Sequence, residues 1–362
     1  MAAHPYRDLP AHRLWRQAIA GLPGEQVDPV VQGAFRIQRD SRVATAGSCF
    51  AQHIARHLAQ AGLHHLVTEP AHSLVAPLAR EFQYGVYSAR YGNIYTARQL
   101  LQTLRRAYGQ FAPRDDAWPA ADGRVIDPYR PRIQPEGFAT LAELQEDRAQ
   151  HHAAIRRMVA EMDVFIFTLG LTEAWCNRQD GAIYPLCPGV AGGEFQPERH
   201  GFLNFRAAEV VADLGDAIAL IGAHNPAARV ILTVSPVPLI ATMEERSVLT
   251  ATTYSKAVLR VAAEEVAAAF PQVAYFPAYE IITGPHARGL YFDDTLRDVT
   301  EAGIAHVMRL FLRHYVAAEA LAAPAAAMAD PAAAAAAAQH AMLSEAAAVL
   351  CDEALLDRGD GS

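Results

Sequence analysis

Short apolar segments that alternate with helical stretches constrain the fold of this chain more than any other feature. The most apolar are "DVFIFTLG" (163–170) and "ARVILTVSP" (228–236), which are continuous and end at a glycine or a polar turn. Strands that are buried on both faces of a parallel sheet have this character. Because helix-prone segments separate them, the sequence predicts a parallel sheet with helices on both faces.

The pattern predicts the other elements as well. Strands are expected within 41–50, 63–69 and 273–282, and helices at 51–62, 95–109, 140–162, 207–226, 254–270 and 300–316. Two segments rich in Pro and Gly, 112–137 and 180–201, are expected to be a surface excursion and an irregular insertion. We therefore predict one three-layered α/β domain over residues 35–316, with a mostly parallel sheet.

The two ends of the chain lie outside this predicted domain. Residues 1–34 form an N-terminal extension. Residues 317–362 are rich in alanine, with seven consecutive alanines at 332–338 and no periodic apolar face. We predict a helix-prone, peripheral tail that takes no part in the functional site.

Charge and composition exclude several classes of function. The net charge of -8 provides no basic surface for a nucleic-acid backbone. No apolar run reaches the roughly 18 residues of a membrane-spanning helix, and the first residues lack the apolar core of a signal peptide, so we expect a cytoplasmic protein. The four widely spaced cysteines suit neither a disulfide framework nor a zinc site. We expect no metal and no cofactor, and the oligomeric state stays open.

In a parallel α/β sheet, ligands bind at the carboxyl ends of the strands. This rule selects four segments of the sequence: 47–48, 170–173, 235–238 and 283–300. Ser48 follows a predicted strand and opens a helix, so its hydroxyl and backbone N–H would face the same space, as a nucleophile requires. The alternative is a serine that caps the helix N-terminus. Cys49 is expected to be a small buried hydrophobe rather than a second nucleophile.

Four motifs carry a resemblance to a known family. They are "GSCFA" (47–51), "TLGLTEAW" (168–175), "TVSPVPLIAT" (233–242) and "YSKAVLR" (254–260), in this order. Together they resemble the GSCFA domain family over roughly residues 40–315. The resemblance implies a doubly wound domain similar to the SGNH/GDSL hydrolases, with Ser48 as the nucleophile after the first strand.

The resemblance also implies partners for Ser48. In those hydrolases a glycine and an asparagine donate hydrogen bonds to the oxyanion, and Gly92 and Asn93 in "ARYGNIYT" are the matching candidates. A plain Gly-Asn turn is the alternative. Thr172 stands where a further asparagine is expected, and a threonine can still donate one bond. Glu173 is expected to orient a neighbour or bind a substrate hydroxyl.

The expected base is where the sequence departs from the hydrolase pattern. An Asp-x-x-His motif should precede the last helix, but the segment beginning at Asp294 has Arg297 in place of histidine. Arginine stays protonated and cannot accept the proton of a serine. His306, on the second turn of the last helix, is the candidate base, with His286 in the preceding loop as another. Arg297 would instead bind an anionic group of the substrate.

Lys256 is a further candidate, because thirty arginines accompany this one lysine. A buried lysine can act as a base when its pKa falls. The alternative is an ion pair with Glu173 or Asp294 that holds the site together. The sequence thus predicts a serine esterase or O-acyltransferase for O-acylated carbohydrate or a related polar ester, in polysaccharide metabolism. The alternative is an inactive, hydrolase-like protein that binds carbohydrate during the production of surface polysaccharide.

Overall fold

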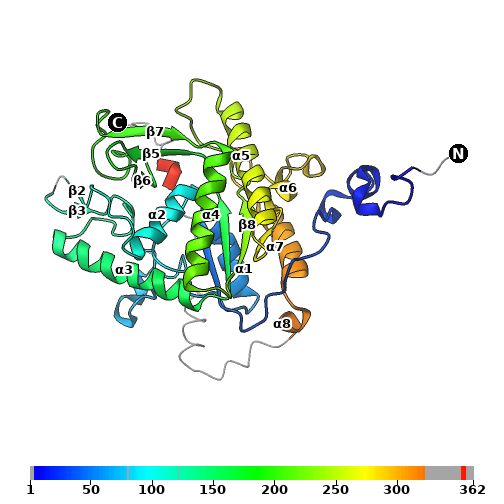
Figure 1. Ribbon diagram of the computed structural model, residues 1–362, viewed down its shortest axis with the longest axis horizontal. Helices are drawn as coiled ribbons and strands as arrows, with labels where there is room; N and C mark the ends of the chain where they lie inside the picture. Colours follow the sequence, from blue (N-terminus) through cyan, green and yellow to red (C-terminus); the bar gives the residue numbers. More distant parts are fainter. Residues whose placement is uncertain (1–3, 80, 121, 323–351, 356–362) are drawn as a thin grey trace.

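A four-stranded parallel sheet forms the centre of the computed structural model, which describes residues 4–79, 81–120, 122–322 and 352–355 (Figure 1). Its strands are β1 (Val43–Gly47), β4 (Val164–Leu169), β8 (Arg229–Val234) and β9 (Val273–Tyr275), in the order β1-β4-β8-β9. Every pairing between them is parallel. The prediction of a parallel sheet from the continuous apolar segments is confirmed.

The register of the sheet aligns the carboxyl ends of its central strands. Gly47 of β1 pairs with Thr168 of β4, and Leu169 pairs with Val234 of β8. The residues that follow these strands, Ser48 and Gly170 among them, therefore emerge at one edge of the sheet.

Helices cover both faces of the sheet, and each face has its own core. The side chains of Phe165 and Phe167 pack into one core, whereas those of Val164 and Ile166 pack into the other. The first core is covered by α2 (Ala97–Ala107), α3 (Leu141–Glu161), α4 (Ala207–His224) and α5 (Val248–Ala269), and the second by α1 (Phe50–Gln60), α6 (Ala278–Thr283) and α7 (Glu301–Tyr315). The predicted three-layer α/β/α fold is confirmed.

Two predicted strands differ from the structure. In the segment 63–69, His65 forms a single parallel bridge with Val43 instead of a strand. The predicted strand 273–282 divides at Pro277 into β9 and α6. Proline lacks the N–H that a strand would use in its ladder, and its fixed φ suits the start of a helix.

Short antiparallel sheets lie within and beside the predicted irregular segments. β5 (Glu173–Asn177) lies between β6 (Ile183–Tyr184) and β7 (His200–Asn204), and β2 (Trp118–Pro119) pairs with β3 (Val125–Ile126). The short sheet β6-β5-β7 begins directly after the central strand β4, so it extends outward from the carboxyl edge of the main sheet (Figure 1).

The remaining elements are short, and two segments that flank the domain, near Val30 and near Val316, pack on it. α8 (Ala318–Ala322) follows α7, and Ile37 pairs with Val316. Val30, in the N-terminal extension, belongs to the core below α7. None of the helices described is long and apolar enough to cross a membrane. Other short helical turns are η1 (Ala11–Arg13), η2 (Arg16–Ala20), η3 (Gly24–Gln26), η4 (Ser73–Leu78), η5 (Pro285–Ala287) and η6 (Asp352–Leu355).

Candidate functional site

Ser48 lies buried at the carboxyl end of β1. The N-cap of α1 is Cys49, which makes no side-chain capping bond, so Ser48 is not the capping residue. Only 4% of Ser48 is exposed, and its Oγ has no hydrogen-bond partner among the residues that the structure describes. Buried hydroxyls nearly always have a partner, and an exception calls for an explanation.

Gly170 packs directly against the Ser48 side chain, at a distance that leaves no room for a Cβ. A Cβ at Gly170 would lie 3.0 Å from the Cβ of Ser48, 3.5 Å from its Oγ and 3.1 Å from the carbonyl oxygen of Tyr95. The prediction that Ser48 lies next to Gly170 is confirmed. Any larger residue at position 170 would press on the serine.

The loop Gly92–Tyr95 is hydrogen-bonded to the carboxyl ends of β1 and β4. Ile94 donates its N–H to the carbonyl of Gly47 (2.8 Å), and Gly170 donates to the carbonyl of Tyr95 (3.1 Å). Gly92 has φ of 72°, a conformation that other residues seldom adopt. These bonds hold Asn93 beside the same edge of the sheet as Ser48.

A glutamine network fixes the orientation of the Asn93 side chain. Gln52 of α1 donates to Oδ1 of Asn93 (3.2 Å), and Gln99 of α2 donates to its backbone carbonyl (2.9 Å). The Nδ2 group then donates to Oδ2 of Asp352 (2.8 Å), in η6. Asn93 is only 1% exposed, so this donor is rigidly held.

Two backbone N–H groups beside Ser48 are already engaged. The N–H of Ser48 points to the carbonyl of Thr168 at a long 3.4 Å. The N–H of Gly170 is bonded to Tyr95. The side-chain amide of Asn93 is engaged as well, with the carboxylate of Asp352.

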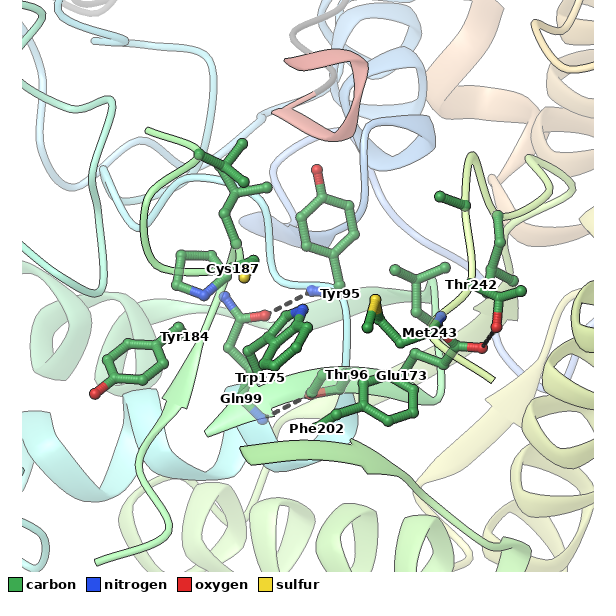
Figure 2. A pocket seen from close by; sticks show the side chains of 17 residues that line it. Tyr95, Thr96, Gln99, Glu173, Trp175, Tyr184, Cys187, Phe202, Thr242 and Met243 are labelled. Atoms are coloured by element: carbon green, nitrogen blue, oxygen red, sulfur yellow. Dashed lines mark hydrogen bonds between the residues drawn. The ribbon is translucent and has the colours of Figure 1, made fainter. Parts of the chain in front are cut away.

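A mostly apolar cavity of about 230 Å³ adjoins the loop Gly92–Tyr95 (Figure 2). Tyr95 and Leu171, one residue beyond Gly170, belong to its wall, and Figure 2 shows the indole of Trp175 among its lining side chains. The other lining residues are Thr96, Gln99, Glu173, Ala174, Tyr184, Pro185, Leu186, Cys187, Val190, Phe202, Leu239, Ala241, Thr242 and Met243.

Glu173 is the acidic group of this cavity. It accepts hydrogen bonds from the Thr242 hydroxyl (2.6 Å) and the Met243 N–H (3.3 Å), and burial raises its pKa. Thr172, predicted to bind substrate, is fully buried, and its hydroxyl donates to Asn204 (2.7 Å). Of these two predicted residues, Glu173 lines the cavity.

Lys256 lies behind the site. It is 1% exposed, and its Nζ donates to the carbonyl of Gly170 (2.7 Å). This bond holds the peptide that passes next to Ser48. The lysine thus contacts Gly170, the residue that lies next to the predicted nucleophile.

His306 lies in a different environment, between α7 and the N-terminal extension. The carbonyl oxygen of Val27 is 3.0 Å from Nε2, and the Tyr291 hydroxyl is 2.7 Å from Nδ1. A carbonyl can only accept, so Nε2 carries the proton and Nδ1 accepts from the tyrosine. Burial lowers the pKa of His306, which favours this neutral form. Both nitrogens are occupied in this conformation, and the role of base stays a prediction.

The loop before α7 holds the predicted anion-binding residues. Asp294 is exposed, whereas the Arg297 side chain is 15% exposed and lies 3.6 Å from the carboxylate of Asp298. Thr300 caps α7 by accepting from the N–H of Gly303. His286, the other histidine of this region, is partly buried, and burial lowers its pKa.

Asp352 corrects the prediction that the tail lies away from the site. Its carboxylate accepts from Asn93 and, at 2.9 Å, from Arg132. Sequence reasoning missed Gln52, Arg132 and Asp352. The seven consecutive alanines of the tail lie outside the described residues.

Residues 42–311 match the model of the GSCFA family. A search of curated proteins finds no match. The matched region contains Ser48, the loop Gly92–Tyr95 and the segment that follows β4, whereas Asp352 lies beyond it.

Proposed function

We propose a function for this chain on the premise that it belongs to the GSCFA family. It is a serine esterase or O-acyltransferase that acts on O-acylated carbohydrate or a related polar ester, in polysaccharide metabolism. The observation that carries the proposal is the Ser48 hydroxyl, which is buried, without a hydrogen-bond partner in the described structure, and next to Gly170.

The Ser48 oxygen would attack the carbonyl carbon of the ester. The carbonyl oxygen then gains negative charge, and donors held in place beforehand stabilise it. The amide of Asn93 suits this role once Asp352 releases it, because Gln52 and Gln99 hold Asn93 in place. The N–H of Gly92 is the proposed second donor. The cavity beside Tyr95 would receive the apolar part of the substrate, with Trp175 as one wall.

A base must accept the Ser48 proton and return it to the departing alcohol. His306 remains the proposed base, and it would first have to leave the carbonyl of Val27 or the hydroxyl of Tyr291. Lys256 is the alternative, since it already contacts the residue beside Ser48. Water completes the reaction in a hydrolase, and an acceptor hydroxyl completes it in a transferase.

The remaining predicted residues would bind substrate. Arg297 would bind a carboxylate or phosphate, because its planar group matches two oxygens at once. Glu173 would accept a hydrogen bond from a sugar hydroxyl at the rim of the cavity. Thr172 and Lys256 would support these groups, and Asp294 would act with the catalytic residues.

The test compares purified wild-type protein with Ser48→Ala on p-nitrophenyl acetate and acetylated sugars. We expect the wild type to release acetate and Ser48→Ala to fall to background. Cys49→Ala is the matched control, because it alters the neighbouring thiol and should keep its activity. Equal background rates for all three proteins would refute the catalytic proposal.

A second candidate is a protein that binds carbohydrate without reacting with it. The occupied nitrogens of His306 and the arginine at position 297 favour this candidate. It predicts that acidic oligosaccharides bind the wild type and Ser48→Ala equally, and that Arg297→Ala weakens binding, as measured by calorimetry.

A further inference from the structure

The carboxylate of Asp352 is held at a site that is built around it. Its Oδ2 accepts from Nδ2 of Asn93 at 2.8 Å, and its Oδ1 accepts from a guanidinium nitrogen of Arg132 at 2.9 Å. Only 7% of Asp352 is exposed. Buried carboxylates are costly unless charged or polar donors satisfy them, and here each oxygen has its own donor.

The two donors come from the body of the domain. Asn93 belongs to the loop beside Ser48, and Arg132 follows the hairpin formed by β2 and β3. The nearby Arg130 is neutralised by Asp127 and Asp147 of the body. Arg132 differs, because the carboxylate that it contacts comes from the far end of the chain. We call the space between Asn93 and Arg132 the anion notch.

The anion notch adjoins the apolar cavity. Pro185 lines both spaces, and the loop Gly92–Tyr95 contributes Asn93 to one and Tyr95 to the other. Figure 2 shows η6 beyond the ring of Tyr95, in agreement with the bond between Asp352 and Asn93. A ligand that fills both spaces would have an apolar part and a carboxylate.

We propose that the anion notch is a carboxylate-binding subsite whose resident occupant is Asp352, and that a ligand carrying a carboxylate displaces η6 from it. The donors that hold Asp352 match any carboxylate of similar reach. Because η6 is covalently attached, it competes at a high effective concentration, and the external ligand must overcome this advantage. One consequence rests on the proposed function: while Asp352 occupies the amide of Asn93, that amide cannot serve an oxyanion.

Hydrogen exchange of the full-length protein, read by mass spectrometry over residues 352–355, tests the proposal without any turnover. We expect slow exchange in the wild type and in Glu353→Ala, the matched neighbouring acid. Exchange should accelerate about 10-fold in Arg132→Gln and in Asp352→Ala. Unchanged protection of β4 in each variant controls for folding.

The ligand arm of the experiment adds D-glucuronate or, as the neutral control, D-glucose to the wild type. Glucuronate should accelerate exchange at residues 352–355, and glucose should not. The proposal is overturned if residues 352–355 exchange equally fast in wild type and Arg132→Gln, or if the two sugars act alike. Loss of esterase activity alone would refute the proposed reaction and leave this result standing.

Discussion

Ser48 and His306 are buried to the same degree, at 4% and 3% exposure, yet their surroundings differ completely. His306 has a partner for each nitrogen, supplied by Tyr291 and Val27. The Ser48 hydroxyl has none among the described residues. A satisfied buried group contributes to folding, whereas an unsatisfied one costs free energy and is retained for another reason. The carboxyl end of β1 is therefore the better candidate for chemistry.

The largest expected effect is that of Ser48→Ala. If Ser48 is the nucleophile, turnover should fall about 10³-fold or more. The free energy of unfolding should change by less than about 0.5 kcal/mol, because no hydrogen bond of the side chain is lost. Ester hydrolysis and urea denaturation measure the two quantities. A clear loss of stability would show that the Ser48 hydroxyl has a structural partner. It would contradict the contrast drawn between Ser48 and His306.

His306→Ala should behave in the opposite way. It leaves the Tyr291 hydroxyl and the Val27 carbonyl unpaired, so we expect a loss of about 2 kcal/mol in the free energy of unfolding. If His306 is also the base, turnover falls on the order of 10²-fold at temperatures where the variant is folded. Tyr291→Phe sharpens the result, because it removes one partner and keeps the imidazole.

The outcome for Lys256 decides the base assignment. Should His306→Ala keep full turnover while Lys256→Ala loses it, the proton acceptor would be the lysine and His306 would be a packing residue. Arg297→Lys, by contrast, should mainly raise KM, since it keeps the charge and loses the two-point geometry.

Gly170→Ala tests whether the space beside Ser48 matters. The added Cβ would lie 3.0 Å from the serine Cβ, so the nucleophile must shift, and we expect turnover to fall about 10-fold or more. Gly222→Ala is the matched control, since nothing lies within 4 Å of its added Cβ and it sits within α4. That control should stabilise the protein by about 0.5–1 kcal/mol and leave turnover unchanged.

The smallest expected effect is the pH dependence of Asp352. Burial raises the pKa of its carboxyl, with Asn93 and Arg132 opposing the shift. The docked state therefore holds the proton more tightly than the released state. Docking should be strongest below the ordinary aspartate pKa and weaken as pH rises through the raised value. Protection of residues 352–355, relative to Arg132→Gln at each pH, should follow this trend.

Two controls belong to the pH experiment. Asp352→Asn should remove the trend, because its amide does not titrate. Tyr87 also faces this carboxylate, and burial raises the pKa of Tyr87 well above its ordinary value. Tyr87 should therefore not titrate in the acid range. A trend that persists in Asp352→Asn would contradict the assignment.

The sequence predicts the central fold because its signals are local. The continuous apolar residues of β4 and the apolar face of α2 each suffice to identify an element. Ser48 and Gly170 follow from the rule that sites gather at strand ends. The sheet of β5, β6 and β7 was missed, because its strands are separated by a long segment rich in Gly and Pro.

The partners of the site residues were harder to predict, because they are distant in the sequence. The hydrogen bond between Val27 and His306 joins residues 279 positions apart in the sequence, and the bond between Asp352 and Asn93 joins residues 259 positions apart. No periodicity or turn signal encodes such a pair. Asp352 is also preceded by an alanine-rich segment without an apolar face, which gave no reason to expect a contact.

The wall formed by Pro185 has a thermodynamic consequence. Because the cavity and the anion notch share this residue and the loop Gly92–Tyr95, we expect molecules bound in the two spaces to affect each other's affinity. Such coupling is reciprocal: if an apolar molecule in the cavity weakens the docking of η6, docked η6 weakens that molecule's binding by the same factor. Apparent affinities for any inhibitor of the cavity would then depend on how many molecules in the sample have η6 docked.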